Sequence, residues 1–177
     1  MWRNRRRYRL LVLFTLAFLA VGAGWVSRAS TAASAAVSIA RLQAAGGGSV
    51  TVTPFVSQHS PWFNEDQVRL ANTAPVSALS VTIVVQRTAG VSFSGQYNTV
   101  GGQVLQSNSS TSSAIAYRFT LATGQTLGPG SGWIFAAQSS GNGTTHPTGG
   151  DTYAATFTTG GVTSTQSGHL PNVDPLP

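Results

Sequence analysis

The sequence has no cysteine and no lysine, and it carries little charge of either sign. Without cysteine there is no disulfide framework, no thiolate nucleophile and no cysteine-ligated metal, so stability must come from apolar burial and hydrogen bonding. Charged residues make up 8% of the chain, while glycine, serine and threonine are abundant. This composition is typical of an exported β protein with many turns rather than of a cytosolic enzyme.

The formal net charge of +6 does not describe the whole chain. Six of the ten arginines lie in the first 28 residues, whereas from residue 36 onward four arginines are balanced by four acidic residues. A nucleic-acid groove needs clustered cations that neutralise several phosphates. No such cluster follows residue 41. We therefore exclude nucleic acid as a partner.

Residues 1–35 have the pattern of a targeting segment. An arginine-rich start precedes the uncharged apolar run of residues 10–26, and an A-x-A cleavage signal follows at 33–35. We expect a signal peptide, or, without cleavage, a signal-anchor helix whose residues 10–26 are the only membrane contact. Either outcome places the remainder outside the cell, secreted in the first case and membrane-anchored in the second. Residues 36–49 end in Gly-Gly-Gly-Ser and are expected to be a flexible spacer.

Two alternating apolar stripes predict the core of the folded part. Residues 78–86 form the clearest strand, expected to be central, with one apolar side: Leu79, Val81, Ile83 and Val85. Residues 115–121 carry a second, partly aromatic stripe: Ile115, Tyr117, Phe119 and Leu121. We expect the two stripes to lie on opposite sheets and to face each other.

Further short strands are expected at 50–53, 67–71, 91–93, 103–106, 133–137 and 153–157, and Pro54 either confines the first to a sheet edge or ends it. Seven or eight strands without helical periodicity predict an all-β fold, an antiparallel Greek-key or immunoglobulin-like β-sandwich over residues 50–160. Residues 161–177 are expected to be a disordered or frayed tail.

The titratable residues offer little catalytic chemistry. Glu65 and Asp66 are adjacent and would point to opposite faces of a strand, which does not suit the paired carboxylates of a glycosidase, although Asp151 could partner one of them. A secreted glycoside hydrolase is therefore a distant third hypothesis, and no cofactor is expected. Three histidines lie in separate loops or in the tail and are expected to be solvated rather than to bind metal: His59, His146 and His169.

Aromatic residues outside the predicted core are the main functional signal. Trp62 and Tyr97 lie in loops or at strand ends, where flat rings can stack on sugars while the amides of Gln96 and Asn98 bind hydroxyls. The alternative is that such rings cap the open ends of the sandwich. The two interpretations are balanced for Trp62, ligand contact is favoured for Tyr97, and the core is favoured for Trp133.

Several short motifs follow one another over residues 66–150: Val-Arg-Leu-Ala-Asn-Thr at 68–73, the strand at 79–85, Tyr97 with Asn98, Leu-Gly-Pro-Gly at 127–130, Trp-Ile-Phe at 133–135, and Ser-Gly-Asn-Gly at 140–143 with Pro147. This order resembles the bacterial family 2 carbohydrate-binding modules, the cellulose- and xylan-binding sandwiches of secreted hydrolases. The resemblance implies sugar binding by a row of aromatic rings, with Tyr97 at a tryptophan position of that family. The chain departs from the family in lacking its terminal cysteine pair and in having Leu79 in place of another tryptophan.

The sequence thus predicts an exported, non-catalytic β-sandwich that binds polysaccharide through surface aromatics. Tyr97 and Trp62 are the expected stacking residues, and Gln96 and Asn98 the expected hydrogen-bonding residues. The alternative is a membrane-tethered structural or interaction domain of the cell surface, with no sugar ligand.

Overall fold

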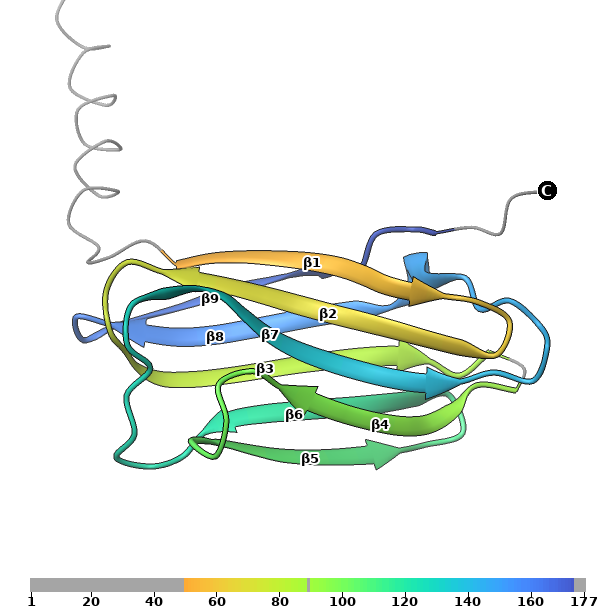
Figure 1. Cartoon of the computed structure of the whole chain (residues 1–177), viewed down its shortest axis with the longest axis horizontal. Helices are drawn as coiled ribbons and strands as arrows, with labels where there is room; N and C mark the ends of the chain where they lie inside the picture. Colours follow the sequence, from red (N-terminus) through yellow and green to blue (C-terminus); the bar gives the residue numbers. More distant parts are fainter. Residues whose placement is uncertain (1–49, 89, 174–177) are drawn as a thin grey trace, which may run out of the picture.

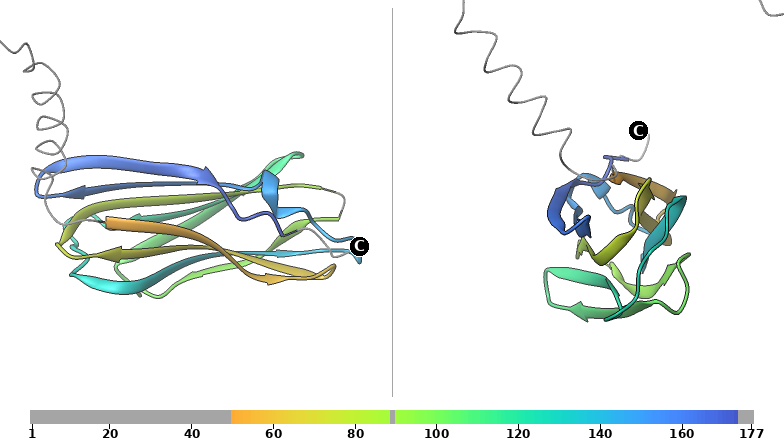
Figure 2. Two further views of the ribbon diagram at one scale, coloured as in Figure 1. Left: turned by 90° about the horizontal axis from the view of Figure 1, so that it is seen from above. Right: turned by 90° about the vertical axis from the view of Figure 1, so that its left-hand side faces the viewer.

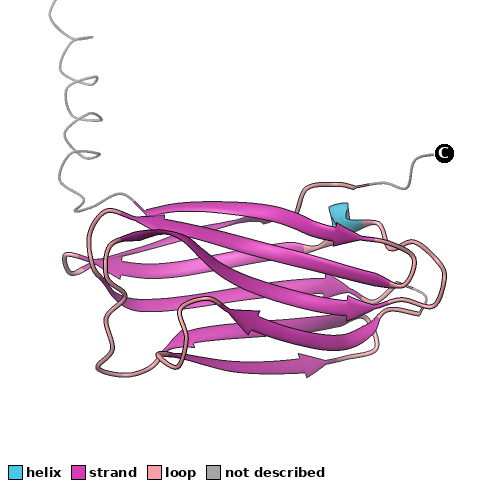
Figure 3. Ribbon diagram, in the orientation of Figure 1, coloured by secondary structure: helices cyan, strands magenta, loops and turns pink. Residues whose placement is uncertain are grey.

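The computed structural model describes residues 50–88 and 90–173, which form a sandwich of two antiparallel sheets (Figures 1 and 3). The predictions for residues 1–49 and 174–177 (targeting segment, spacer and the end of the tail) lie outside these residues. Within the described residues, no helix is long and apolar enough to cross a bilayer. The all-β, antiparallel two-sheet prediction is confirmed.

The four-stranded sheet has the order β1-β2-β7-β4 and the five-stranded sheet the order β5-β6-β3-β8-β9. The bounds are as follows: β1 Val50–His59, β2 Phe63–Asn72, β3 Val76–Gln86, β4 Ser92–Asn98, β5 Val104–Ser110, β6 Ala114–Leu121, β7 Gly130–Ser140, the 3-10 turn η1 Thr148–Gly150, β8 Thr152–Thr159 and β9 Val162–His169. Seen end-on, the two sheets lie as two layers (Figure 2, right). As expected, β3 is central and β1, which contains Pro54, lies at an edge.

Both predicted stripes are buried, but they do not face each other. β3 pairs directly with β6, so Val81 lies beside Phe119, and Ile83 beside Tyr117, in the same five-stranded sheet. The opposite wall of the core comes from the four-stranded sheet, where Phe119 meets Phe135 edge-on with ring centroids 5.5 Å apart. The expectation of opposite sheets was wrong because alternation shows that a face is buried, not which strand lies beside it.

The expected frayed tail is also corrected in part. Residues 162–169 form β9, which pairs with β8 along its whole length. Paired threonine hydroxyls line the outer side of this pair, with Thr156 bonded to Thr165 at 2.9 Å and Thr158 to Thr163 at 2.8 Å. Leu170 then enters the core, with only 3% of its surface exposed. This segment has almost no apolar periodicity, so hydrophobicity alone could not identify it as a strand.

Residues 107–110, which lie beyond the strand predicted at 103–106, belong to β5, which pairs with β6 through Ser110. Likewise, the strands predicted at 50–53 and 67–71 are longer than expected: β1 extends to His59 and β2 begins at Phe63, which leaves a tight turn between them. That turn and the segment between β7 and β8 lie at the same end of the sandwich, the right-hand end in Figure 1. The candidate site is built on this end and on the outer face of the four-stranded sheet.

Candidate functional site

The outer face of the four-stranded sheet carries a continuous set of polar and aromatic side chains, which we call the outer patch. Strand register places Phe55 of β1 beside Gln67 of β2, Gln67 beside Ala136 of β7, and Ala136 beside Tyr97 of β4. The next row pairs Glu65 with Gln138. The outer patch consists of Phe55, Glu65, Gln67, Arg69, Tyr97 and Gln138. Its side chains alternate along the strands with core residues such as Val68, so they point away from the core.

Hydrogen bonds link the outer patch around Glu65. The Tyr97 hydroxyl donates to Glu65 Oε1 at 3.0 Å, and the Gln67 amide donates to the same oxygen at 2.6 Å. The Gln138 amide donates to Glu65 Oε2 at 2.8 Å. Arg69 donates to the amide oxygen of Gln67 at 2.9 Å, and its guanidinium lies over the Phe55 ring, 3.6 Å from the centroid. The patch is therefore pre-organised, with one anion and one cation held on the same face.

The surroundings of Glu65 favour its charged form. Burial alone would raise its pKa, but hydrogen bonds from Gln138, Gln67, Tyr97 and Ser57 more than offset burial and lower the pKa below its ordinary value. The pKa of Tyr97 is raised, first by burial and then by its bond to Glu65. Tyr97 thus remains a neutral donor and Glu65 a carboxylate at neutral pH.

Trp62 occupies the turn between β1 and β2, and 67% of its surface is exposed. The backbone of the β7–β8 segment supports this turn: Gly141 N–H donates to the Trp62 carbonyl at 2.9 Å, and Gly143 N–H donates to that of Pro61 at 3.0 Å. A Cβ at Gly143 would lie 3.0 Å from the indole ring, and Gly143 has a φ of +100°. The indole therefore rests against bare backbone while much of its surface stays open to solvent.

Trp62 and Tyr97 are separate points on this surface. Tyr97 is in register with Gln67, five residues along β2 from Trp62. At about 3.4 Å per residue, the two side chains are about 17 Å apart along the strands alone. They cannot stack on the same sugar ring, but a chain of several sugar units could contact both.

Gln96 and Asn98 are oriented away from the outer patch, because they alternate with Tyr97 along β4. The Gln96 amide donates to the carbonyls of Ser107 and Arg118, at 3.3 and 3.4 Å, and so bridges the two sheets. The Asn98 side chain accepts a bond from Gly101 N–H at 2.9 Å in the following turn. The structure therefore brings neither amide together with the Tyr97 ring.

A buried cluster of titratable side chains lies at the Trp62 end of the core. His146 Nε2 is 2.7 Å from Asp151 Oδ2, and both side chains are fully buried. The Asp151 Oδ1 atom accepts the Gln86 N–H at 2.7 Å, and Thr88 Oγ1 is 2.8 Å from His146 Nδ1. The expectation that His146 is a solvated loop residue was wrong, because the segment from 141 to 150 folds back over the open end of the core. His59 Nε2 contacts the His146 carbonyl at 2.8 Å.

Asp66 completes the cluster. As predicted, Glu65 and Asp66 point to opposite faces, and Asp66 is the one that meets Asp151. Burial raises the pKa of Asp66 to about 8, and the neighbouring Asp151 adds to the rise. Asp66 and Asp151 are 2% and 0% exposed, so this carboxyl pair is closed to a substrate. In the described part of the chain no group of three potential ligands forms a metal site.

Sequence reasoning missed Phe55, Gln67 and Gln138. The alternation of Glu65, Gln67 and Arg69 along one strand was a usable signal for a polar face that points away from the core. Only the fold shows that Gln138 and Tyr97 lie beside it, and that these neighbours leave Glu65 and Gln67 only 7% and 3% exposed. A hollow of about 400 Å³ continues this face at its other end, between Thr51, Asn72 and Pro129.

No family model and no curated protein sequence matches the chain. Among solved structures, the chain is similar to the cohesin module from the family 33 glycoside hydrolase of Clostridium perfringens ATCC13124. The TM-score is 0.40 at 9% identity, over 70% of this chain and 96% of that module. A likeness at this level carries no argument about function. The resemblance to family 2 carbohydrate-binding modules stays a prediction.

Proposed function

We propose that the domain is a non-catalytic module that binds a polysaccharide chain along the outer face of its four-stranded sheet. The observation that carries this proposal is the outer patch: amide and carboxylate groups already fixed by hydrogen bonds, between the rings of Phe55 and Tyr97. Sugar-binding surfaces combine flat rings that cover apolar sugar faces with fixed polar groups that bind hydroxyls, and pre-organisation lowers the entropic cost of binding.

Trp62 is the second contact point in this proposal. Its indole is exposed, and the glycine backbone behind it limits its movement. Because Trp62 and Tyr97 are about 17 Å apart along the strands, the ligand must be a polymer of several sugar units. One anion and one cation on the patch favour a neutral polymer over a strongly charged one. Gln96 and Asn98 are left out of the proposed site, since both are bonded within the protein.

The proposed location is outside the cell, by secretion or by an uncleaved anchor, as expected from residues 1–35. An immunoglobulin-like, Greek-key classification is proposed for the sandwich. The chain crosses between the two sheets after β2, β3, β4, β6 and β7, which is compatible with that topology.

A second candidate is a cell-surface structural or interaction domain without a sugar ligand. The bonds inside the outer patch favour it, because they already occupy the Tyr97 hydroxyl, the Gln67 amide and both Glu65 oxygens. In this second candidate the hydrogen-bond network stabilises the outer sheet face, where Glu65 and Gln67 are already covered by their neighbours, and it binds no ligand.

Retention on insoluble polymers separates the two candidates. Residues 36–177 are incubated with microcrystalline cellulose, xylan and chitin, beside Tyr97→Ala, Trp62→Ala and the control Leu105→Ala, whose exposed side chain lies on the other sheet. The polysaccharide proposal expects retention on at least one polymer, a marked loss in both aromatic variants and none in the control. No retention, or retention that neither aromatic variant reduces, would favour the second candidate.

A further inference from the structure

The segment of residues 141–147 lies between Trp62 and the buried cluster, and it is attached to both. On one side, Gly141 and Gly143 bond to the turn that carries Trp62. On the other side, His146 is held by Asp151 through Nε2, by Thr88 through Nδ1 and by His59 through its carbonyl. Any displacement of His146 is therefore transmitted through a few residues to the support of the Trp62 indole.

Hydrogen bonding shows which carboxyl group of the cluster holds a proton. Asp151 receives the Gln86 N–H and the His146 Nε2–H, and it also bonds to Asp66. Three such contacts suit a carboxylate, which only accepts. Asp66 Oδ1, by contrast, is buried without a partner. An unpartnered buried oxygen is far less costly on a neutral carboxyl than on a carboxylate. Asp66 is therefore the protonated member and donates to Asp151.

We propose that Asp66, Asp151 and His146 are positioning residues for Trp62, and that ionisation of Asp66 releases the segment of residues 141–147 and moves the indole. This inference rests on the proposed function only in so far as Trp62 binds a polymer. Ionisation would place two carboxylates side by side without solvent, and their repulsion must be relieved by movement of one side.

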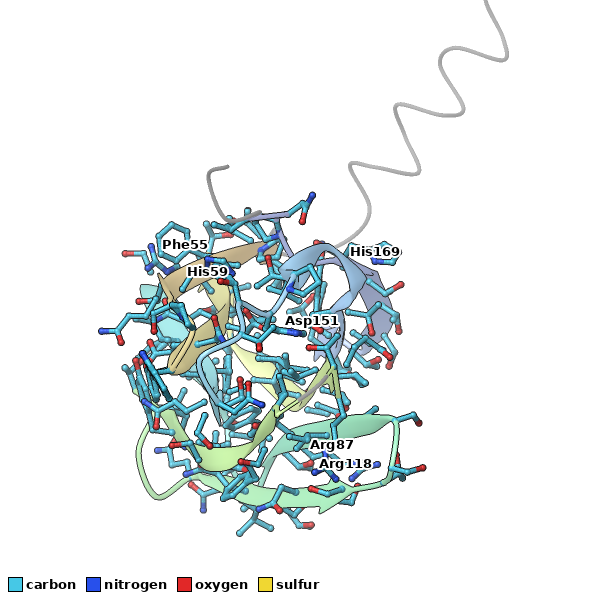
Figure 4. The ribbon with its side chains drawn as sticks, turned by 90° about the vertical axis from the view of Figure 1, so that its right-hand side faces the viewer. Phe55, His59, Arg87, Arg118, Asp151 and His169 are labelled. Atoms are coloured by element: carbon cyan, nitrogen blue, oxygen red, sulfur yellow. The ribbon has the colours of Figure 1, made fainter. Side chains whose placement is uncertain are left out.

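The side that moves is the β7–β8 segment. Asp66 lies within β2, which is paired with Val56 of β1 and Ala137 of β7. His146 lies in a segment without strand pairing, and Asp151 directly follows the 3-10 turn η1. Figure 4 looks onto this end, with Asp151 close to the middle, His59 on β1 and Arg87 at the end of β3.

Other titratable groups face the same cluster. They are His146 and His59, described above, and Tyr117 of β6, whose pKa is raised by burial and then by the charges of Asp66 and Asp151. Arg87 is engaged with the carbonyls of Val91 and Thr111 at the surface, and Glu65 faces the opposite side of β2. The pKa of Asp66, about 8, separates its ionisation from that of Tyr117, whose pKa lies far higher.

The test follows Trp62 directly. The full chain, in detergent micelles, is labelled with 5-fluorotryptophan, and its 19F spectrum is recorded from about pH 6 to about pH 10. The chain has four tryptophans, and single Trp62→Phe and Trp133→Phe variants assign two of the signals. Trp133 is the internal control, because its indole N–H bonds to Asn72 at the opposite end of the sandwich.

The expected result is a shift of the Trp62 signal with a midpoint near pH 8 and no matching shift of Trp133. Asp66→Asn, which keeps a donor toward Asp151 but cannot ionise, should abolish the shift, whereas Glu65→Gln should leave it unchanged. Absence of the Trp62 shift, or an equal shift of Trp133, overturns the proposal. So does a shift that survives Asp66→Asn, since a group other than Asp66 then causes it.

Two further measurements keep the test decisive. If Asp66→Asn does not fold, Thr88→Val replaces it: this variant loses the bond to His146 Nδ1 without touching the indole. A pH-dependent Trp62 shift that changes in size or midpoint supports the coupling, and an unchanged shift overturns it. Polymer retention of the wild type should fall several-fold between about pH 7 and about pH 9.5. A chain that binds no polymer at any pH refutes the proposed function, while the 19F shift still decides this inference.

Discussion

At the scale of single residues, Tyr97 combines two functions that one substitution can separate. Tyr97→Phe removes the donor to Glu65 but keeps the ring, so polymer retention should stay near that of the wild type, whereas Tyr97→Ala should lose it. Because Glu65 is only 7% exposed and keeps its other donors, loss of one hydrogen bond to its carboxylate should cost about 1 kcal/mol of unfolding free energy. Urea denaturation measures this cost, and a retention loss as large in Tyr97→Phe as in Tyr97→Ala would contradict the stacking role.

The Tyr97→Phe variant should also change the pKa of Glu65. Its carboxylate is favoured by four side-chain donors, so removal of the Tyr97 hydroxyl should raise the pKa of Glu65 toward its ordinary value. Glu65 is the only glutamate in the sequence, so 13C labelling of glutamate gives a single carboxyl signal to titrate. Gln96→Ala is the matched control, since Gln96 lies beside Tyr97 in sequence but contacts the other sheet. An unchanged titration in Tyr97→Phe would show that the hydroxyl contributes little.

The orientation or burial of a side chain could be predicted from sequence only where it depends on neighbouring residues of the chain. The opposite orientations of Glu65 and Asp66 follow from the alternation of a strand and were predicted correctly. The burial of His146 was not, because it depends on residues 66, 88 and 151 meeting in space. Gln96 and Asn98 were assigned wrongly for a different reason: Tyr97 was expected in a loop or at a strand end. The structure shows that β4 runs through Asn98, where alternation turns both amides away from the Tyr97 ring.

At the scale of elements, the turn that carries Trp62 depends on Gly143. In Gly143→Ala, the Cβ would lie 3.0 Å from the indole, and the φ of +100° would be strained. Retention should fall, with a stability loss of about 1–2 kcal/mol from the backbone alone. Gly124→Ala provides the control, because Gly124 has a φ of +79° but nothing within 4 Å of an added Cβ. Equal retention in the two variants would exclude a specific support for Trp62.

The corrected C-terminal strand leads to a stability prediction. Leu170 follows β9 and is 3% exposed, and its N–H donates to the Asp151 carbonyl at 2.9 Å. Leu170→Ala should cost about 2–5 kcal/mol, the range for emptying a buried leucine site. Val162→Ala, at the 50% exposed start of the same strand, should change stability by less than about 0.5 kcal/mol. Thermal unfolding compares them, and equal melting temperatures would indicate that this segment does not support the core.

Elements were predictable where an apolar stripe marks one face. The strands at 78–86 and 115–121 were identified for this reason, whereas β9 and the second half of β5 are polar and were not. Their strand structure comes from pairing with β8 and β6, which is a tertiary contribution that a single sequence does not display. The stripes also could not show that β3 and β6 pair within one sheet. The same residues would be buried if the two strands lay on opposite sheets and faced each other.

At the scale of the whole molecule, both proposed contact regions depend on β2. Its inward side chains include Val68 and Leu70 of the core and Asp66 of the buried cluster, and its outward side chains include Glu65 and Gln67 of the outer patch. The turn before it carries Trp62. The outer patch and the buried cluster therefore share one strand. The pH dependence of stability should contain contributions of opposite sign from two adjacent carboxyl groups of this strand, those of Glu65 and Asp66.

For Asp66, the folded-state pKa of about 8 lies above the ordinary aspartate value of 3.8. Between these values the native state keeps a proton that the unfolded chain has lost, so stability is highest near pH 4 and falls as the pH rises toward 8. Each unit of this difference corresponds to about 1.4 kcal/mol. The lowered pKa of Glu65 acts in the opposite sense: its contribution is present at neutral pH and is lost in acid, below the ordinary glutamate value.

Asp66→Asn should therefore flatten the stability profile between about pH 4 and about pH 8. Because the amide can still donate to Asp151, the variant should resemble the wild type near pH 4 and be more stable by several kcal/mol at pH 8. Denaturant unfolding at a series of pH values measures both profiles, with Glu65→Gln as the neighbouring control that should keep the slope in this range. A slope that persists in Asp66→Asn would show that the proton is held elsewhere in the cluster, and the coupling of the buried carboxyl pair to Trp62 would lose its physical basis.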